Sequence, residues 1–272
     1  MLLQFNIHYL TTYGQRLVIK TNHPKQTEIE LHYQANGQWQ GEWETGAIPA
    51  GFNYMYILME GEQLVRQEMN QARSLAGVKG DQVIIEDSWQ ASELPASALY
   101  TSAFEEVVFK PQQELKTRSI RRAKGKVKLH LRMLEIRVPT HLTLAVTGNT
   151  EELGNWGTNG AVKLANDAFP LWQSVMIVRP GEYLEYKYVL VDKNTGNIVH
   201  WESGPNRTYT VPLGADVAVK TDVDLATFTD NWKGSGVAMP VFSLRTQNSY
   251  GSGEFTDIKL LVDWAKKVGM QM

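Results

Sequence analysis

Short segments with apolar residues at every second position are the sequence feature that most limits how this chain can fold. They occur in the first 60 residues as Leu3–Tyr9, Glu28–Tyr33 and Phe52–Leu58, and turn residues such as Asn36-Gly37 separate them. This alternation is typical of strands that bury one face. Several strands at this spacing predict an antiparallel sandwich or barrel over residues 1–89.

The same pattern returns in the second half of the chain. The segment Asn53–Leu58 aligns with Glu185–Leu190, and Glu68–Arg73 aligns with Glu202–Arg207 at nearly the same offset. We interpret this as a diverged internal repeat. The sequence therefore predicts two immunoglobulin-like β-sandwiches in tandem, at residues 1–89 and 126–228.

Residues 90–125 interrupt the alternation and form a predicted connector. Its end is basic, and the run continues into the second sandwich as Lys116, Arg118, Arg121, Arg122, Lys124, Lys126 and Lys128. Because no aromatic residues are interleaved, we interpret the run as a solvated connector, with a polyanion contact as the alternative.

The remaining residues, 229–272, change character. An apolar run at Gly236–Leu244 predicts a strand, a glycine-rich loop follows, and Thr256–Gly269 predicts an amphipathic helix with Thr256 as N-cap and Gly269 at the C-cap. A second strand is expected from Met270. This order is that of a β/α unit, and one such unit cannot cover a parallel sheet, so we expect a barrel that continues beyond this chain.

Composition excludes several classes of function. The formal net charge is -2, and the chain has no cysteine. Nucleic acid and anionic membranes are therefore not expected partners, and disulfides and thiolate metal sites are excluded. We read no signal peptide or membrane span, which predicts a cytoplasmic protein. The six histidines have no metal-ligand spacing, so we expect no metal and no cofactor.

The stretch from Gly148 to Asn206 carries the strongest functional signal. Trp156 follows Gly-Asn in a predicted turn, where an indole is costly to leave in water unless a flat ligand covers it. A sugar ring has the apolar faces and polar edges that such a site needs. Trp172 lies within an apolar strand and is expected in the core.

Residues 126–224 resemble a family-20 starch-binding carbohydrate-binding module. The resemblance rests on Leu-Gly-Asn-Trp, Pro-Leu-Trp, Glu-Tyr-Lys-Tyr and Trp-Glu-Ser-Gly-Pro-Asn-Arg, which occur in the order and spacing of that family. It implies binding of α-1,4-glucans such as starch, glycogen or maltooligosaccharides. The implied contacts are indole stacking by Trp156 and Trp201, and hydrogen bonds to sugar hydroxyls from Lys187, Glu202 and Asn206. For Asn206, stabilisation of its own loop is an equally expected role.

Weaker glucan contacts are implied for two further residues. The second site of the family uses tyrosines; Phe169 stands at one of those places, and Tyr13 in the first copy lies in a similar motif. The first copy lacks the Leu-Gly-Asn-Trp turn and has Met55 and Gln67 in place of Lys187 and Trp201. We therefore expect it to keep the fold without the aromatic platform.

Residues 229–272 resemble the start of the (β/α)8 barrel of family-77 glycoside hydrolases, the 4-alpha-glucanotransferases. The motifs are Ser-Leu-Arg, Tyr-Gly-Ser-Gly-Glu-Phe and Leu-Val-Asp-Trp-Ala-Lys-Lys-Val-Gly-Met. The resemblance implies glucan transfer by the parent protein, with its catalytic carboxylates outside these 272 residues. Glu254, Asp257 and Asp263 lie in a loop or on a predicted exposed helix face, so this part alone is expected to be inactive. Tyr250 is either a substrate contact in the full barrel or a packing residue of its loop.

An alternative hypothesis, from a different class of function, is that both sandwiches are non-catalytic scaffold. In that case the exposed aromatic residues would form a protein-interaction or dimerisation surface, as on many immunoglobulin-like domains.

Overall fold

The computed structural model describes residues 1–69, 73–93, 95–111, 114–157, 160–223, 236–247 and 250–270. The chain divides into two compact units, 1–229 and 230–272, and each is described by itself. The predicted boundary at residues 228 and 229 lies outside the described residues, as do Gln271 and Met272 of the second strand expected after the helix.

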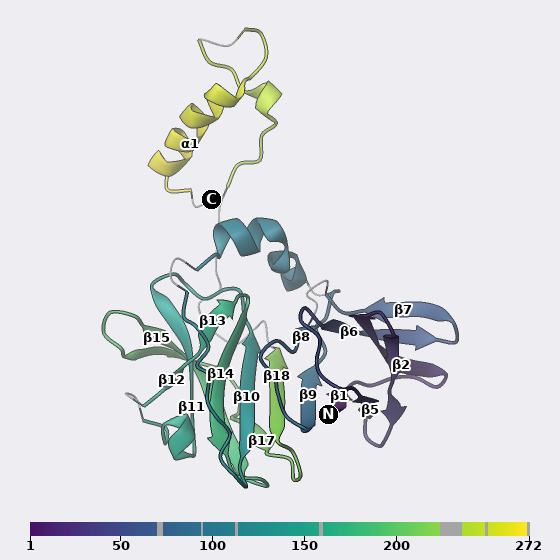
Figure 1. Cartoon of the computed structure of the whole chain (residues 1–272). Coiled ribbons are helices and arrows are strands. Elements are labelled where there is room, and N and C mark those ends of the chain that lie inside the picture. Colours follow the sequence, from purple (N-terminus) through teal and green to yellow (C-terminus); the bar gives the residue numbers. More distant parts are fainter. Residues whose placement is uncertain are drawn as a thin grey trace. The chain divides into compact units, whose positions relative to one another are not determined.

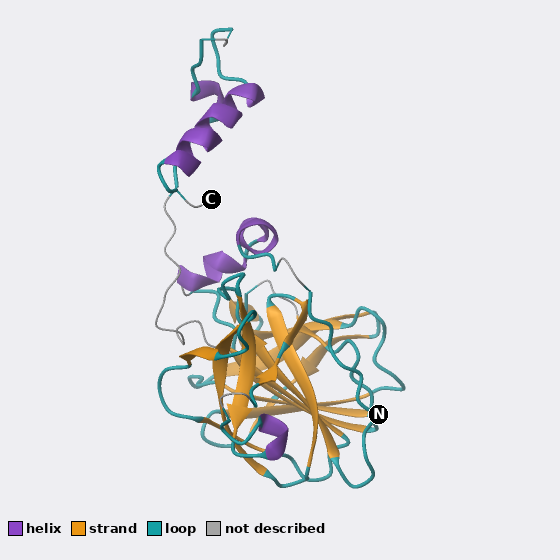
Figure 2. Ribbon diagram, turned by 90° about the vertical axis from the view of Figure 1, so that its left-hand side faces the viewer, coloured by secondary structure: helices purple, strands orange, loops and turns teal. Residues whose placement is uncertain are grey.

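Strands make up most of the first unit (Figure 2). Those of its first half are β1 (Leu2–His8), β2 (Gln15–His23), β3 (Gln26–Glu30), β4 (His32–Tyr33), β5 (Gln38–Glu44), β6 (Asn53–Glu60), β7 (Gln63–Gln67), β8 (Arg73–Ser74) and β9 (Gln82–Ser88). One sheet has the order β3-β2-β6-β7, with β8 also paired to β6. It packs against β5, β1 and β9, and the core between them contains Phe5, Leu17, Tyr56 and Ile85.

The second half repeats this arrangement. Its strands are β10 (Val127–Leu134), β11 (Leu142–Gly148), β12 (Val162–Lys163), β13 (Ala165–Ala168), β14 (Leu171–Val178), β15 (Tyr183–Asp192), β16 (Ile198–Trp201), β17 (Arg207–Thr210) and β18 (Val217–Val223). One sheet has the order β12-β11-β15-β16, with β17 also paired to β15. Its core against β10, β14 and β18 includes Trp172, which is 2% exposed, so its predicted place in the core is confirmed.

The two halves are not independent domains, because one eight-stranded sheet runs through both of them (Figure 1). Its order is β13-β14-β10-β18-β9-β1-β5-β4, and the joint is a parallel pairing of β18 with β9. The pairs β1–β9 and β10–β18 are also parallel. The sheet is therefore mixed and not purely antiparallel as predicted, since the first and last strands of each half are joined through long connections that permit either direction.

The residues at this joint show that the two cores lie on opposite faces of the shared sheet. Val217 and Val219 of β18 belong to the core of the first half, whereas Ala218 belongs to that of the second. Ile84 of β9 packs against the second core in return. Since neighbouring residues of a strand point to opposite faces, each joint strand contributes to both cores. Each half thus depends on a strand of the other.

A buried polar network lies in the first half. The hydroxyls of Tyr54 and Tyr56 donate hydrogen bonds to Asp87 Oδ2 at 2.8 and 3.1 Å. Arg73 donates from Nε to Glu68 at 3.1 Å and lies 3.1 Å from Asp87. Burial, and then the charge of Asp87, raise the pKa of both tyrosines well above its usual value.

The second half contains the same network. Tyr186 and Tyr188 donate to Asp222 Oδ2 at 2.7 and 3.0 Å, and Arg207 Nε donates to Glu202 at 2.6 Å. Five side chains therefore repeat in type and partner. Four of them lie in the two segments that the sequence alignment matched, and the pair of Asp87 and Asp222 was not part of that alignment. This agreement supports a common origin for the two halves.

The connector contains a short π-helical turn at Phe104–Val108 and an extended segment up to β10. Leu115 N–H donates to Asn166 Oδ1 at 2.6 Å, and Thr117 N–H donates to Asp167 at 2.9 Å. These hydrogen bonds fix the segment along β13 of the second half. The connector is therefore part of the second sandwich's surface.

The second unit contains a 3₁₀ turn at Val241–Ser243 (η4), another at Phe255–Asp257 (η5) and the helix α1 (Ile258–Lys267). The predicted helix is confirmed, but its start differs: Glu254 and Asp257 form a capping box, so Thr256 is not the N-cap. Asp257 is 6% exposed, so its predicted exposure is wrong. No strand occurs at 236–247, where an apolar run predicted one. Among all described residues, no helix has the length and hydropathy to cross a membrane.

Candidate functional site

The loop that carries Trp156 is held in one shape by close backbone approaches. A Cβ on Gly148 would lie 2.4 Å from the Glu185 carbonyl oxygen, and one on Gly154 would lie 2.0 Å from that of Gly160. Gly154 also has φ +79°, which favours glycine. Trp156 N–H donates to Gly148 O at 2.8 Å and closes the loop. The Leu-Gly-Asn-Trp turn thus presents a half-buried indole at a fixed position.

Trp201 ends β16 on the outer face of the sheet β12-β11-β15-β16. It lies opposite Val189 of β15, and its side chain is 41% exposed. Tyr186 and Tyr188 point into the core, so Lys187 between them lies on the same outer face as Trp201. The Trp156 loop leaves β11 one residue beyond Thr147, which is paired with Lys187. The loop of Trp156 therefore starts beside Lys187.

Lys187 is a structural clamp as well as a candidate ligand contact. Its Nζ donates to the carbonyl oxygens of Glu202 at 3.0 Å and Gly204 at 2.6 Å. An ammonium group has three donors, so one remains for a further acceptor. Asn206 Nδ2 donates to Glu185 Oε1 at 2.8 Å. This hydrogen bond gives Asn206 the predicted role of stabilising its loop. Its amide is also exposed beside Glu185, so the predicted sugar contact is compatible with that role.

Glu202 differs from the other predicted contacts. It is 4% exposed, and its carboxylate accepts hydrogen bonds from Arg207 and from the backbone N–H of Tyr188 at 3.0 Å. Glu68 occupies the same place in the first half, where the tryptophan of the platform is missing. The side chain therefore belongs to the buried network that repeats in both halves, and its predicted glucan contact stays a prediction.

The weaker candidates lie on other elements than β15 and β16. Tyr13 is fully exposed in the first half, and Tyr250 in the second unit is 94% exposed. Phe169 is half-buried and packs edge-on against Trp172, with ring centroids 6.3 Å apart. The ring of Phe169 is thus largely committed to the core.

Two residues of the site were missed from the sequence. Glu185 lies two residues before Lys187, so period-two alternation alone places it on the outer face. Asn149 latches the Trp156 loop to β15: its side chain accepts from Glu185 N–H at 2.9 Å and donates to Tyr183 O at 3.1 Å. Its position directly after the strand was a signal for such a latch.

The described residues contain no group of three or more His, Asp or Glu side chains placed to hold a metal ion. Asp257 accepts hydrogen bonds from Thr246 and from the backbone N–H of Glu254, which is a helix-capping role. The arrangement on β15 and β16 offers indole faces with donors and acceptors at their edges. Chemically this is a binding surface.

Comparison with known proteins agrees with this kind of site. The family model described as the starch binding domain matches residues 126–221, which include the whole aromatic face. The second sandwich is thus the part of the chain that is similar to the starch binding domain family.

The chain as a whole is similar to the 4-alpha-glucanotransferase DPE2 of Oryza sativa subsp. japonica, with 31% identity over 99% of this chain and 30% of the rice protein. A cyclomaltodextrin glucanotransferase of Bacillus sp. (strain 1-1) is 45% identical over 28% of this chain and 11% of its own length. Among solved structures, a family-15 glucoamylase from Hypocrea jecorina is 36% identical and covers 38% of this chain and 18% of its own, with a TM-score of 0.34. The chain spans less than a third of the length of these proteins.

Proposed function

We propose that the second sandwich binds α-1,4-glucan on the outer face of β15 and β16, between Trp156 and Trp201. The observation that carries this proposal is the exposed indole of Trp201 at the end of β16. Lys187 on the neighbouring strand is held on the same face by its hydrogen bond to the Glu202 carbonyl oxygen. The corresponding position in the first half holds Gln67 on β7, paired with Ile57. The sandwich forms without a tryptophan there, so the fold itself does not require Trp201.

The chemistry of the face fits a curved chain of glucose units. Each glucose has an apolar C–H face that an indole can cover, and hydroxyls at its rim that need hydrogen-bond partners. Lys187 supplies a charged donor and Asn206 an amide on the same face, and charge-assisted hydrogen bonds fix the register of a sugar. The binding contacts that we propose are therefore Trp156, Trp201, Lys187 and Asn206.

Isothermal titration calorimetry with maltoheptaose and with β-cyclodextrin tests the proposal. Trp201→Ala is expected to weaken binding roughly thirtyfold, which corresponds to about 2 kcal/mol for a central aromatic contact. Trp264→Ala is the matched control, because Trp264 lies in the second unit and is 46% exposed. Equal affinities of the two variants for maltoheptaose would refute the site.

We further propose that the whole protein is a 4-alpha-glucanotransferase and that this chain brings α-glucan to it. The similarity to the rice protein along nearly the whole chain supports this, as does the family resemblance of residues 229–272. The catalytic carboxylates would then lie in the remaining part of the protein. The 272-residue chain incubated with maltotriose is expected to produce no oligosaccharide longer than maltotriose. The appearance of longer products would show that the catalytic residues lie within these 272 residues.

An interaction surface is the second candidate function, and one observation favours it. Strand β7 is an edge strand whose five residues are all exposed, including Leu64 and Val65. Exposed apolar edges are typical of surfaces that pair with another chain. Light scattering with and without maltoheptaose separates the two candidates, since a scaffold forms a larger species without sugar.

A further inference from the structure

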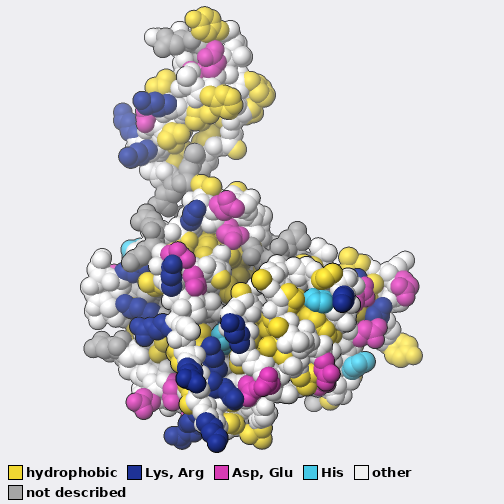
Figure 3. Space-filling view, viewed as in Figure 1, with side chains coloured by type: hydrophobic (Ala, Val, Ile, Leu, Met, Phe, Trp, Pro, Cys, Tyr) yellow, Lys and Arg dark blue, Asp and Glu magenta, His cyan; other side chains and the backbone are white. Residues whose placement is uncertain are grey.

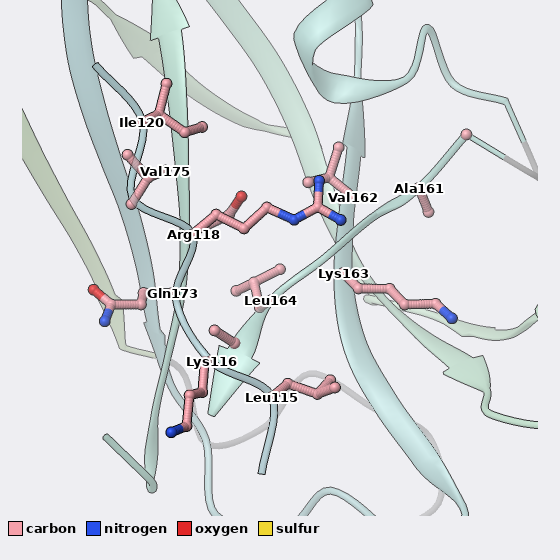
Figure 4. A pocket seen from close by; sticks show the side chains of 13 residues that line it. Leu115, Lys116, Arg118, Ile120, Ala161, Val162, Lys163, Leu164, Gln173 and Val175 are labelled. Carbon is pink, nitrogen blue, oxygen red and sulfur yellow. The ribbon is translucent and has the colours of Figure 1, made fainter. Parts of the chain in front are cut away.

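A pocket of about 580 Å³ lies where the connector crosses the edge of the second sandwich (Figure 4). The connector forms one wall, the segment around β12 forms another, and β14 forms the third.

Hydrogen bonds to β13 and β14 hold the connector wall of the pocket in place. Leu115 and Asn166 exchange two hydrogen bonds, at 2.6 and 2.9 Å. The Thr117 hydroxyl donates to Asp167 at 2.7 Å and accepts from Gln173 at 2.8 Å. Partial burial opposes ionisation of Asp167, but the hydrogen bonds from Thr117 outweigh it and lower its pKa. The Asp167 carboxylate is thus engaged in holding the wall.

The pocket is positively charged. Lys116, Arg118 and Lys163 line it, and its described lining contains no aspartate or glutamate. None of these three side chains has an ion-pair partner among the described residues, whereas Arg122 further along the connector pairs with Asp216 at 2.5 Å. Figure 3 shows Lys and Arg side chains gathered on the face of the second sandwich. In Figure 4, the Arg118 side chain extends across the pocket toward Ala161 and Val162.

The size and walls of the pocket indicate more than a small inorganic anion. Its volume falls in the range of small-molecule sites, roughly 300–1,000 Å³. Leu115, Ile120, Val162, Leu164 and Val175 give it apolar walls beside the three cations. This combination suits a ring with apolar faces that carries an anionic group.

The pocket adjoins the aromatic face. Lys163 of β12 is paired with Ala145 of β11, Ala145 with Val189 of β15, and Val189 with Trp201 of β16, so all four lie in one row across the sheet. Three strand spacings separate Lys163 from Trp201, which is roughly 14 Å. A distance of this size is spanned by a few sugar units of one chain.

We propose that this pocket binds a phosphate monoester carried on an α-glucan chain whose neighbouring units lie on the aromatic face. The inference rests on the proposed glucan-binding function of that face. A phosphate monoester has nearly two negative charges at neutral pH and three acceptor oxygens, which matches a guanidinium flanked by ammonium groups. The basic connector then recognises a modification of the glucan in addition to joining two sandwiches.

Calorimetry with three probes on the full 272-residue chain tests the proposal: maltoheptaose, the same oligosaccharide bearing one glucosyl 6-phosphate, and glucose 6-phosphate alone. The phosphorylated chain is expected to bind about tenfold more tightly than maltoheptaose, because hydrogen bonds between charged groups are the strong ones. The preference falls with rising salt. In the double variant Arg118→Gln/Lys163→Gln the preference disappears and maltoheptaose still binds. Arg121→Gln, an exposed connector residue outside the lining, retains the preference.

Three results would overturn the proposal: equal affinity of the wild type for both oligosaccharides, a preference that survives in the double variant, or an equal loss in Arg121→Gln, which would indicate general charge attraction. Failure of the glucan site is seen separately. If maltoheptaose does not bind, glucose 6-phosphate still reports on the pocket, and its binding must be lost in the double variant. Circular dichroism checks that the variants are folded, which is expected since Arg118 and Lys163 are exposed.

Discussion

Replacing Val219 with alanine tests how far the shared sheet couples the two sandwiches. Val219 belongs to a strand of the second half, yet its side chain is fully buried in the core of the first half. The substitution removes two methyl carbons, worth about 1.6 kcal/mol of transfer free energy. The cavity that remains raises the expected loss of unfolding free energy to about 2–3 kcal/mol.

Urea and thermal unfolding provide the assay. For a unit of this size the melting temperature is expected to fall by about 4–12 °C. Tryptophan fluorescence reports on both halves, through Trp39 and Trp43 in the first core and Trp172 in the second. Fluorescence and far-UV circular dichroism should move together in one transition, because each half loses a strand when the other unfolds.

Val199→Ala is the matched control. Val199 lies on β16 and is 45% exposed, so its replacement is expected to change the unfolding free energy by less than about 0.5 kcal/mol. Two resolved transitions, of which Val219→Ala shifts only one, would refute the coupling that the shared sheet implies.

Three further perturbations address the buried polar groups and the loop. His130 is buried, and burial followed by the charges of Arg132 and Lys128 lowers its pKa to about 3. The unfolded state therefore takes up a proton first as the pH falls below about 6.5, and the free energy of unfolding at pH 4.5 should drop by about 2.7 kcal/mol. Urea midpoints should show this loss in the wild type and not in His130→Leu. Asp222→Ala leaves the buried Tyr186 hydroxyl without its acceptor and removes the carboxylate that faces Arg207; it is expected to cost about 3 kcal/mol in a denaturant titration, with an unchanged midpoint counting against the network. Gly148→Ala is expected to weaken maltoheptaose binding, because its Cβ would displace the Trp156 loop, and wild-type affinity would contradict that geometry.

The sequence was most informative where a local pattern met an internal comparison. Alternation located most strands, and the offset between the halves predicted that Glu68 and Glu202 occupy the same place, which the two networks confirm. Alternation also placed Lys187 opposite its tyrosine neighbours. These conclusions depend only on the spacing of residues along one strand.

What the sequence did not reveal depends on pairing between distant strands. The parallel joint of β18 with β9 has no local signal, because valine-rich strands pair with many partners. The burial of Glu202 was hidden for a similar reason: its partner Arg207 was seen as part of a motif and not as an ion pair. The course of the connector at Leu115 and Thr117 likewise follows from contacts with Asn166 and Asp167, some 50 residues away.

The most direct test of the central claim is the NMR spectrum of the indole N–H groups during titration with maltoheptaose. The chain has eight tryptophans, and each side chain gives its own signal. Our account predicts that the signals of Trp156 and Trp201 shift in proportion to bound sugar, while those of the buried Trp39, Trp43 and Trp172 stay in place. Shifts confined to tryptophans of the first half, or no shift at Trp201 at saturating sugar, would contradict it.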